Sequence, residues 1–142
     1  MQSDNYTPAS VVAEVKKYVG VRRKQAIGSL VKTLHIDNLD VIASYGEDAA
    51  VIQNGRTALL LAADGIWNKL MDIDPYWAGY CAILVNVHDI AAMGGRPVAM
   101  VDILSASDDE VMAQVTNGMR DAANAFNVPV VGGHLHPDAP YN

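Results

Sequence analysis

Cysteine, aromatic residues and basic charge are all scarce in this chain of 142 residues. The one cysteine, Cys81, excludes an internal disulfide and argues against a secreted disulfide scaffold, and its apolar neighbours indicate a buried structural thiol. Aromatic residues make up 6%, so Ala, Val, Ile, Leu and Met must fill the core. The formal net charge of −6 argues against nucleic acid or an anionic membrane as a partner, because both attract clustered Lys and Arg.

Long hydrophobic runs and a targeting segment are absent as well. Asp or Asn interrupts every apolar stretch well short of the roughly 20 residues that a membrane-spanning helix needs. The first ten residues, MQSDNYTPAS, have neither the basic nor the apolar part of a signal peptide. We therefore expect a cytoplasmic protein, and the length and the 51% hydrophobic fraction are those of one globular domain, 1–142.

The first third of the chain predicts a helical arm, 1–44, followed by a β-hairpin. Ser10 is expected to cap a first helix that stops at Gly20, and a second helix is expected over about 22–34. Residues 35–44 suit a strand or an extended arm. Asn54-Gly55 then joins two strand-like runs, 49–53 and 57–63, which is a strong hairpin signal.

The rest of the chain alternates helices and strands. Asp74-Pro75 is a typical cap and first position of a long helix, which Gly94-Gly95 ends near Met93. A buried strand is expected over 98–104, a helix from 107–110 to about Phe126, and a strand over 128–131 that runs into Gly132-Gly133. This order predicts one α+β domain (an α/β sandwich), with a mixed sheet and helices packed on one face.

Acidic side chains stand where these elements begin and end. Glu47 and Asp48 precede the first hairpin strand and Asp64 follows the second, so antiparallel pairing puts them at one edge of the sheet. Asn86 and Asp89 are three residues apart on the long helix and share a face. Converging carboxylates repel one another unless a cation lies between them, and oxygen ligands favour Mg²⁺. Each acid alone is equally explained as a cap, a turn former or a solvated loop residue, but Asp89 lies mid-helix between apolar residues, where an unpaired acid is costly to bury.

Four stretches taken together resemble the aminoimidazole ribonucleotide (AIR) synthetase, or PurM-like, superfamily. They are Gly46-Glu47-Asp48-Ala49-Ala50-Val51-Ile52, Ala63-Asp64-Gly65, Asn86-Val87-His88-Asp89-Ile90-Ala91-Ala92-Met93-Gly94-Gly95-Arg96-Pro97 and Val130-Val131-Gly132-Gly133-His134. The superfamily includes thiamine-monophosphate kinase, selenophosphate synthetase and a hydrogenase maturation factor.

The resemblance implies an N-terminal domain that binds ATP and Mg²⁺, activates an oxygen by phosphorylation, and pairs its sheet with a second copy to form a homodimer. It also implies that a C-terminal domain completes the active site around a small-molecule acceptor, and we expect that domain to be absent from these 142 residues. The metal ligands that it implies are Glu47, Asp48, Asp64 and Asp89. The residues that it implies for cofactor binding are Asn86, Asp89, Gly94, Gly95, Gly132, Gly133, His134 and, from the basic run of the arm, Lys24.

Three departures from the superfamily pattern limit what the resemblance carries over. Glu47 stands where many members have Asp, and His88 replaces the usual Ser, so a hydroxyl has no role there. His134 after the glycine pair is similar to the selenophosphate synthetase branch, yet no cysteine precedes Cys81, which argues against selenium chemistry. The resemblance therefore identifies neither the branch nor the acceptor.

Two other functions fit parts of the sequence. His134, His136 and Asp138 could form a zinc site, because His-x-His on one strand points both imidazoles the same way. A lone domain without a catalytic complement could also be a non-catalytic nucleotide-binding or regulatory module. Measuring ATP hydrolysis on the full-length gene product and on this chain separates that module from an enzyme.

Overall fold

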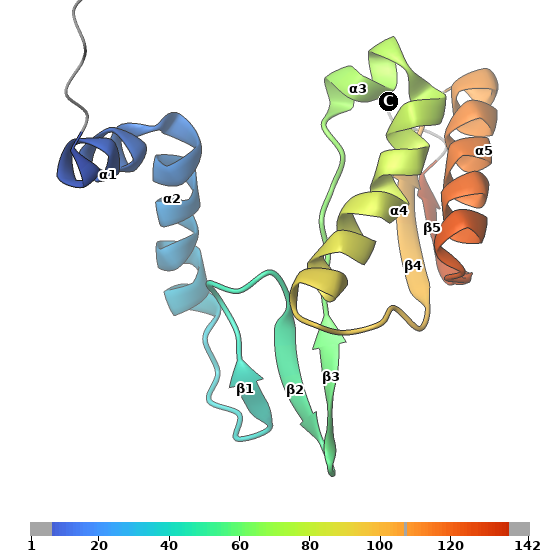
Figure 1. The fold of residues 1–142 in the computed structure, drawn as a ribbon. Coiled ribbons are helices and arrows are strands. Elements are labelled where there is room, and N and C mark those ends of the chain that lie inside the picture. Colours follow the sequence, from blue (N-terminus) through green and yellow to red (C-terminus); the bar gives the residue numbers. More distant parts are fainter. Residues whose placement is uncertain (1–6, 107, 137–142) are drawn as a thin grey trace, which may run out of the picture. The chain divides into compact units, whose positions relative to one another are not determined.

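The computed structural model describes residues 7–106 and 108–136, except for the side chains of residues 23–26. The chain divides into two compact units, 1–39 and 40–142, which are described separately below. Figure 1 shows the helices and strands of both units.

The first unit is a pair of helices, α1 (Pro8–Lys17) and α2 (Val19–Leu34). Thr7, and not Ser10, caps α1: the Thr7 hydroxyl accepts from Ser10 N–H at 3.1 Å and the Ser10 hydroxyl accepts from Thr7 N–H at 3.0 Å. This reciprocal capping box moves the helix start three residues earlier than predicted. Gly20 lies inside α2, since the break between the helices falls at Tyr18.

The second unit begins with an antiparallel sheet of three strands, β1 (Val41–Ala43), β2 (Ala50–Asn54) and β3 (Thr57–Leu61), in that order. The predicted hairpin is confirmed, but its two-residue loop is Gly55-Arg56, because Asn54 pairs with Thr57. Gly55 has a φ of +59° while Arg56 does not have a positive φ, which is the pattern of a type II′ turn. The pairing of Ala50 with Leu61 places the segments before β2 and after β3 at the same sheet edge.

Two helices follow, α3 (Asn68–Ile73), which the sequence did not predict, and α4 (Pro75–Ala92). The carboxylate of Asp74 accepts from Trp77 N–H at 2.9 Å and caps α4 as predicted. At the other end, Gly94 has a φ of +74°, Gly94 N–H donates to Ala91 O and Gly95 N–H donates to Ile90 O, each at 2.9 Å. This is a Schellman motif, so the glycine pair ends α4.

The last elements form a βαβ unit, β4 (Met100–Ser105), α5 (Asp109–Phe126) and β5 (Val130–His136). Asp108 caps α5 by accepting from Glu110 N–H and Val111 N–H. β4 and β5 pair in parallel, with an irregularity beside Val131, and β5 continues through the glycine pair instead of stopping before it. The α+β class is confirmed, but in the described residues the strands form two sheets, an antiparallel one and a parallel pair, where the sequence predicted one mixed sheet. β3 and β4 are separated by α3 and α4, and no pairing joins them.

The core of this unit lies between α4, α5 and the start of β5. Ile83 and Val87 of α4 pack with Ala122 of α5 and Val128. The two helices also touch backbone to backbone: a Cβ on Gly79 would collide with the carbonyl of Val115, and a Cβ on Gly118 would collide with the carbonyl of Tyr76. Figure 1 shows α4 and α5 running side by side.

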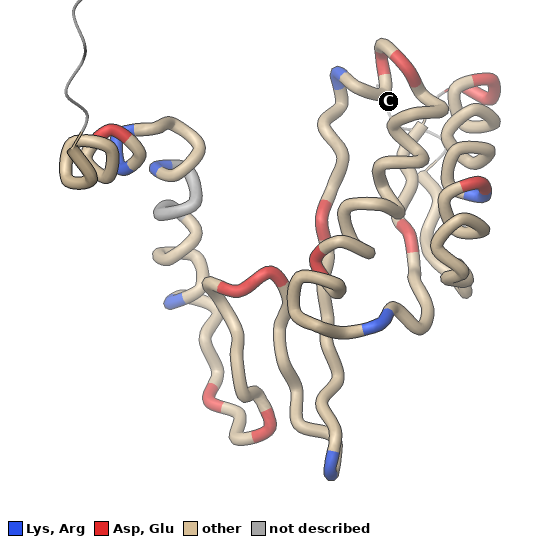
Figure 2. Tube along the Cα trace, in the orientation of Figure 1, with Lys and Arg blue, Asp and Glu red and all other residues tan. Residues whose placement is uncertain are grey.

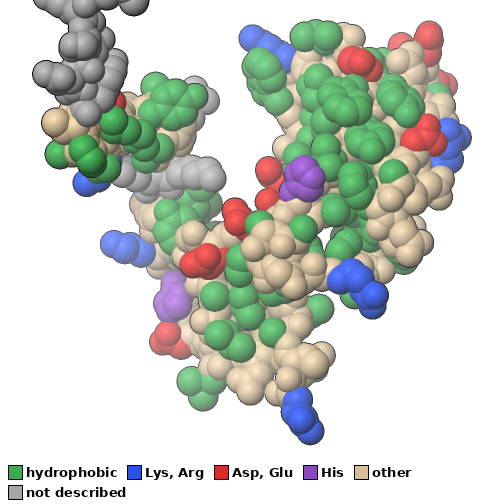
Figure 3. Space-filling model, in the orientation of Figure 1, with side chains coloured by type: hydrophobic (Ala, Val, Ile, Leu, Met, Phe, Trp, Pro, Cys, Tyr) green, Lys and Arg blue, Asp and Glu red, His purple; other side chains and the backbone are tan. Residues whose placement is uncertain are grey.

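Large apolar side chains remain exposed on both sheets. Leu59 and Leu61, which share a face of β3, are 53% and 61% exposed, and Ile103 of β4 is 79% exposed. Hydrophobic side chains gather over β1–β3 on the face shown in Figure 3. No helix in the described part of the chain is both long and apolar enough to cross a membrane.

Candidate functional site

Asp64, just beyond the end of β3, is held by the side chain of Asn86 on α4. Asn86 Oδ1 accepts from Asp64 N–H at 2.9 Å, and Asn86 Nδ2 donates to Asp64 O at 3.3 Å and to Ala82 O at 2.9 Å. The Asp64 carboxylate turns back on its own chain, where Oδ1 accepts from Gly65 N–H at 2.8 Å. The structure therefore brings together two residues that the sequence had placed on separate elements.

The other predicted acids lie on the neighbouring segments. Asp89 follows Asn86 by three residues on the same face of α4 and is half-buried. Glu47 and Asp48 are exposed in the segment between β1 and β2, which reaches the same sheet edge as the segment carrying Asp64. Figure 2 marks acidic positions before β2, after β3 and along α4.

The donor set of this edge suits a hard cation. Its acids and Asn86 offer carboxylate and amide oxygens, the ligands that Mg²⁺ prefers. Among the described side chains, no Lys, Arg or His forms an ion pair with Asp48, Asp64 or Asp89. The described residues contain no group of three or more acidic, His or Cys side chains close enough to hold a metal by themselves. Mg²⁺ usually takes only one or two carboxylates and fills its other positions with water and phosphate oxygens, so the residues fit the ion.

The four predicted glycines differ in how closely other atoms approach them, which the sequence did not distinguish. Gly94 adopts the left-handed conformation that ends α4, and a Cβ on Gly95 would collide with the side chain of Leu60. A Cβ on Gly133 would collide with the backbone of Asp102, whereas nothing lies within 4 Å of a Cβ on Gly132. Of these four glycines, Gly94 and Gly132 therefore leave open space next to the backbone.

The remaining predicted residues lie on β5 and α2. His134 and His136 are exposed, and their rings are 4.4 Å apart between centroids, as expected for alternate residues of one strand. Asp138, the third member of the alternative zinc site, and the side chain of Lys24 lie outside the described residues.

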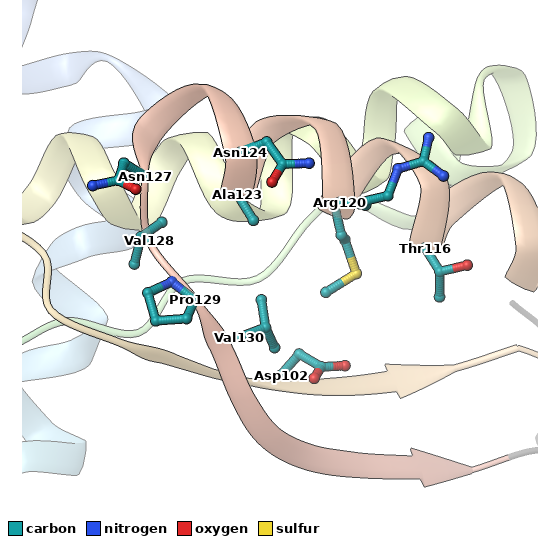
Figure 4. Close-up of a pocket in the computed structure, with 10 residues that line it drawn as sticks. Asp102, Thr116, Arg120, Ala123, Asn124, Asn127, Val128, Pro129 and Val130 are labelled. Carbon is teal, nitrogen blue, oxygen red and sulfur yellow. The ribbon is translucent and has the colours of Figure 1, made fainter.

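A groove of about 690 Å³ between α5 and the β4–β5 sheet was not predicted. Asp102 of β4 and Val130 of β5 point toward α5, from which Thr116, Arg120 and Asn124 line the opposite wall (Figure 4). The one signal in the sequence was Asp102, a single acid within an otherwise apolar strand. The groove shares no lining residue with the predicted site.

A polar contact also joins α4 to α5, away from the predicted metal-binding acids. The Tyr76 hydroxyl donates to Asp121 Oδ2 at 2.9 Å, and Arg120 Nε donates to Asp121 Oδ1 at 2.9 Å. The hydrogen bond from Arg120, followed by the one from Tyr76, lowers the pKa of Asp121, while the bond to the carboxylate raises the pKa of Tyr76. All three groups are exposed to solvent, so the contact orients the helices and is not a buried reactive centre.

The fold defines the class of this protein. It is an α+β domain in which an antiparallel sheet built on a hairpin precedes a βαβ unit. Residues 46–142 match the family described as "AIR synthase related protein, N-terminal domain", and the chain belongs to that family. An uncharacterized protein of Methanocaldococcus jannaschii is 49% identical over 137 residues, and the thiamine-monophosphate kinase of Archaeoglobus fulgidus is 34% identical over 101 residues.

The solved structures agree with this membership. The chain is similar to AaThiL complexed with AMPPCP and TMP, with a TM-score of 0.65 and 26% identity over 78% of this chain. A crystal structure of the thiamine-monophosphate kinase of Aquifex aeolicus gives a TM-score of 0.60 over 79% of this chain. The expected family and its α+β fold are thereby confirmed.

This chain is much shorter than its relatives. The match covers 93% of this chain but 42% of the M. jannaschii protein, and 68% of this chain but 34% of the A. fulgidus kinase. It covers 36% of the AaThiL chain.

Proposed function

We propose that this chain is an ATP- and Mg²⁺-binding N-terminal domain that supports ATP-dependent phosphoryl transfer to, or activation of, an oxygen on a small molecule. The observation that carries the proposal is that Asn86 on α4 bonds both backbone groups of Asp64, while Asp89 lies one helical turn beyond Asn86 on the same face of that helix. Oxygen donors without basic partners at a sheet edge suit a magnesium ion that bridges protein and phosphate. Kinship with thiamine-monophosphate kinases and with AaThiL, which is complexed with AMPPCP, supports ATP as the nucleotide.

The chain's acids would hold the ion, which neutralises the charge of the phosphate oxygens when it is bound. One or two of the proposed acids, Asp64, Asp89, Asp48 and Glu47, would supply its carboxylate ligands, and water and phosphate oxygens would fill its other positions. The open space at Gly94 and Gly132 would let the phosphates approach the backbone closely, because no side chain intervenes there. His134 is a proposed hydrogen-bonding partner of the nucleotide, and a role for Lys24, whose side chain lies outside the described residues, stays a prediction.

We propose that the acceptor is bound, and the active site completed, by parts of the protein outside this chain. Because the match covers less than half of each relative, a further domain is proposed to bind the small molecule and exclude water. The exposed apolar face of β3 is proposed to pair with a second copy, giving a homodimer. We assign no catalytic base: His88 is exposed on α4, beside the proposed ligands but without a described partner.

The test is calorimetry of ATP binding with and without Mg²⁺. Binding should be tight with both present and weak with either alone, because the ion bridges two sets of anions. Equally tight ATP binding in excess EDTA would contradict the proposal.

The separation of the two imidazoles on β5 favours one alternative. Rings 4.4 Å apart on one strand can chelate a transition metal, with Asp138 as the suggested third ligand. Titration with Zn²⁺ tests this function, which requires that His136→Ala abolish binding. Zinc affinity that is unchanged in that variant would exclude it.

A further inference from the structure

We propose that Asn86 is a positioning residue that fixes the metal-binding carboxylate of Asp64 and makes no contact with the nucleotide. The proposal rests on the proposed function for the role of Asp64, and it reverses the expectation that Asn86 itself binds the cofactor. It follows from a count of the hydrogen bonds that the Asn86 amide makes.

A neutral side-chain amide has two N–H donors and one carbonyl acceptor. Both donors of Asn86 are used, one by Asp64 O at 3.3 Å and one by Ala82 O at 2.9 Å, and Oδ1 accepts from Asp64 N–H at 2.9 Å. Rotating the amide by 180° would place its NH₂ against Asp64 N–H and its oxygen against two carbonyls, so only this orientation is satisfied. Asn86 therefore has no donor left for a phosphate oxygen.

The hydrogen bonds of Asn86 also provide partners for backbone groups in the segment after β3. β3 ends at Leu61, and the segment 62–67 that follows is neither helix nor strand. Asn86 bonds both backbone groups of Asp64, three residues beyond the end of β3, as a neighbouring strand would. The Asp64 residue is thereby tied to α4, although its side chain is exposed.

Two further contacts complete the positioning. Ala82, four residues before Asn86, receives one amide proton and fixes the rotamer of Asn86 on α4. Gly65 N–H binds Oδ1 of Asp64 and turns the carboxylate, which leaves Oδ2 for a ligand. Asp89, one turn further along α4, lies on the face that Asn86 shares. Asn86 thus sets the spacing between a carboxylate on a loop and a carboxylate on a helix.

The experiment compares Asn86→Ala and Asn86→Ser with the wild-type chain. A helical serine can donate to the carbonyl four residues earlier, so Asn86→Ser keeps the bond to Ala82 O but is too short to reach Asp64. Asn117→Ala, at an exposed asparagine of α5, is the matched control for replacing a helical asparagine. Three quantities are measured: hydrogen exchange at the Asp64 amide, the Mg²⁺ concentration that half-saturates ATP binding, and ATP affinity at saturating Mg²⁺.

We expect Asp64 N–H to exchange faster in both Asn86 variants, while the amides of Ile83 and Val87 keep their protection. The half-saturating Mg²⁺ concentration should rise roughly tenfold or more, the usual effect of losing a group that orients a metal ligand, with ATP affinity at saturating Mg²⁺ close to wild type. Asn117→Ala should change none of the three.

Unchanged exchange at Asp64 would overturn the proposal, and so would a fall in ATP affinity at saturating Mg²⁺ with an unchanged Mg²⁺ requirement, because Asn86 would then contact the nucleotide. Unfolding of Asn86→Ser would overturn it as well, since the bridge would then belong to the core of the fold. If the wild-type chain shows no Mg²⁺-dependent ATP binding, the proposed function fails, and the exchange measurement still decides whether Asn86 holds Asp64.

Discussion

Tyr76 and Asp121 connect the two longest helices of the domain: the Tyr76 hydroxyl on α4 donates to the Asp121 carboxylate on α5 at 2.9 Å. The same carboxylate accepts from Arg120 Nε, which keeps it charged. Because Tyr76 and Asp121 are far apart in the sequence, their hydrogen bond constrains how α4 and α5 pack.

This contact predicts a pH-dependent contribution to stability. The hydrogen bonds from Arg120 and Tyr76 lower the pKa of Asp121, so its contribution is present above the unfolded pKa of about 3.9 and is lost as the pH falls through the folded pKa. We expect Asp121→Asn to lower Tm slightly at neutral pH and to match the wild type in strong acid. Thermal melts across acid pH measure this, with Asp72→Asn, at an exposed acid of α3, as the control. A Tm difference that is independent of pH would contradict it.

The glycines of β5 offer a matched pair for stability. Gly133→Ala should destabilise the domain by about 1–3 kcal/mol, because its Cβ would collide with the backbone of Asp102, while Gly132→Ala should be tolerated because its Cβ meets open space. Urea unfolding of both variants gives the comparison. Equal stability of the two variants would mean that β5 shifts relative to β4 at little cost.

Asp89→Asn should weaken Mg²⁺-dependent ATP binding roughly tenfold or more, since it removes the charge of a proposed ligand and keeps the shape of the side chain. Calorimetry at fixed Mg²⁺ measures the loss, and circular dichroism checks that the helix content is unchanged. If the variant unfolds and the remaining folded protein binds ATP normally, Asp89 is a structural residue.

The exposed apolar face of β3 predicts a homodimer. Leu59→Lys should convert the chain to a monomer at micromolar concentration, because a charge would be buried in the proposed interface, and Gln53→Lys, at an exposed residue of β2, should not. Sedimentation velocity distinguishes the two states. A monomeric wild-type chain would remove both the dimer and any nucleotide site at its interface.

This chain alone should release phosphate from ATP only at the background rate, although it folds and binds the nucleotide. Its acids can position Mg²⁺ and phosphates, but no described element closes over an acceptor and excludes water. A phosphate-release assay with Mg²⁺ and ATP measures the rate. Robust turnover that disappears in Asp64→Asn would show that the chemistry resides within these 142 residues.

Local signals predicted the fold well where neighbouring residues decide the structure. Asp74-Pro75 starts α4 and Gly94-Gly95 ends it, because cap and terminator act within one helical turn. Asn54-Gly55 indicated the hairpin, but the cross-strand pairing of Asn54 with Thr57 moved the loop by one residue. Thr7 capped α1 in place of Ser10 because either hydroxyl suits the position, and the reciprocal bond decides between them.

Contacts between segments that are distant along the chain could not be predicted from the sequence. Gly79 and Gly118 each look like weak points in a helix, and only their meeting at the α4–α5 contact explains them. The acids of the site were found because three of them stand at element ends, but the role of Asn86 depends on a bond that spans 22 residues. The division of the strands into two sheets likewise depends on where α3 and α4 carry the chain, which no local pattern encodes.

The glycine contacts between α4 and α5 decide which side of the site can adjust. Helices that touch through their backbones cannot slide along each other without forcing atoms into overlap. The face of α4 that bears Asn86 and Asp89 is therefore fixed in position relative to α5. The segment 62–67 meets α4 through the hydrogen bonds of a side chain, Asn86, and not through a backbone contact of this kind. When ions differ in size or coordination, we expect segment 62–67 to shift while α4 keeps its position.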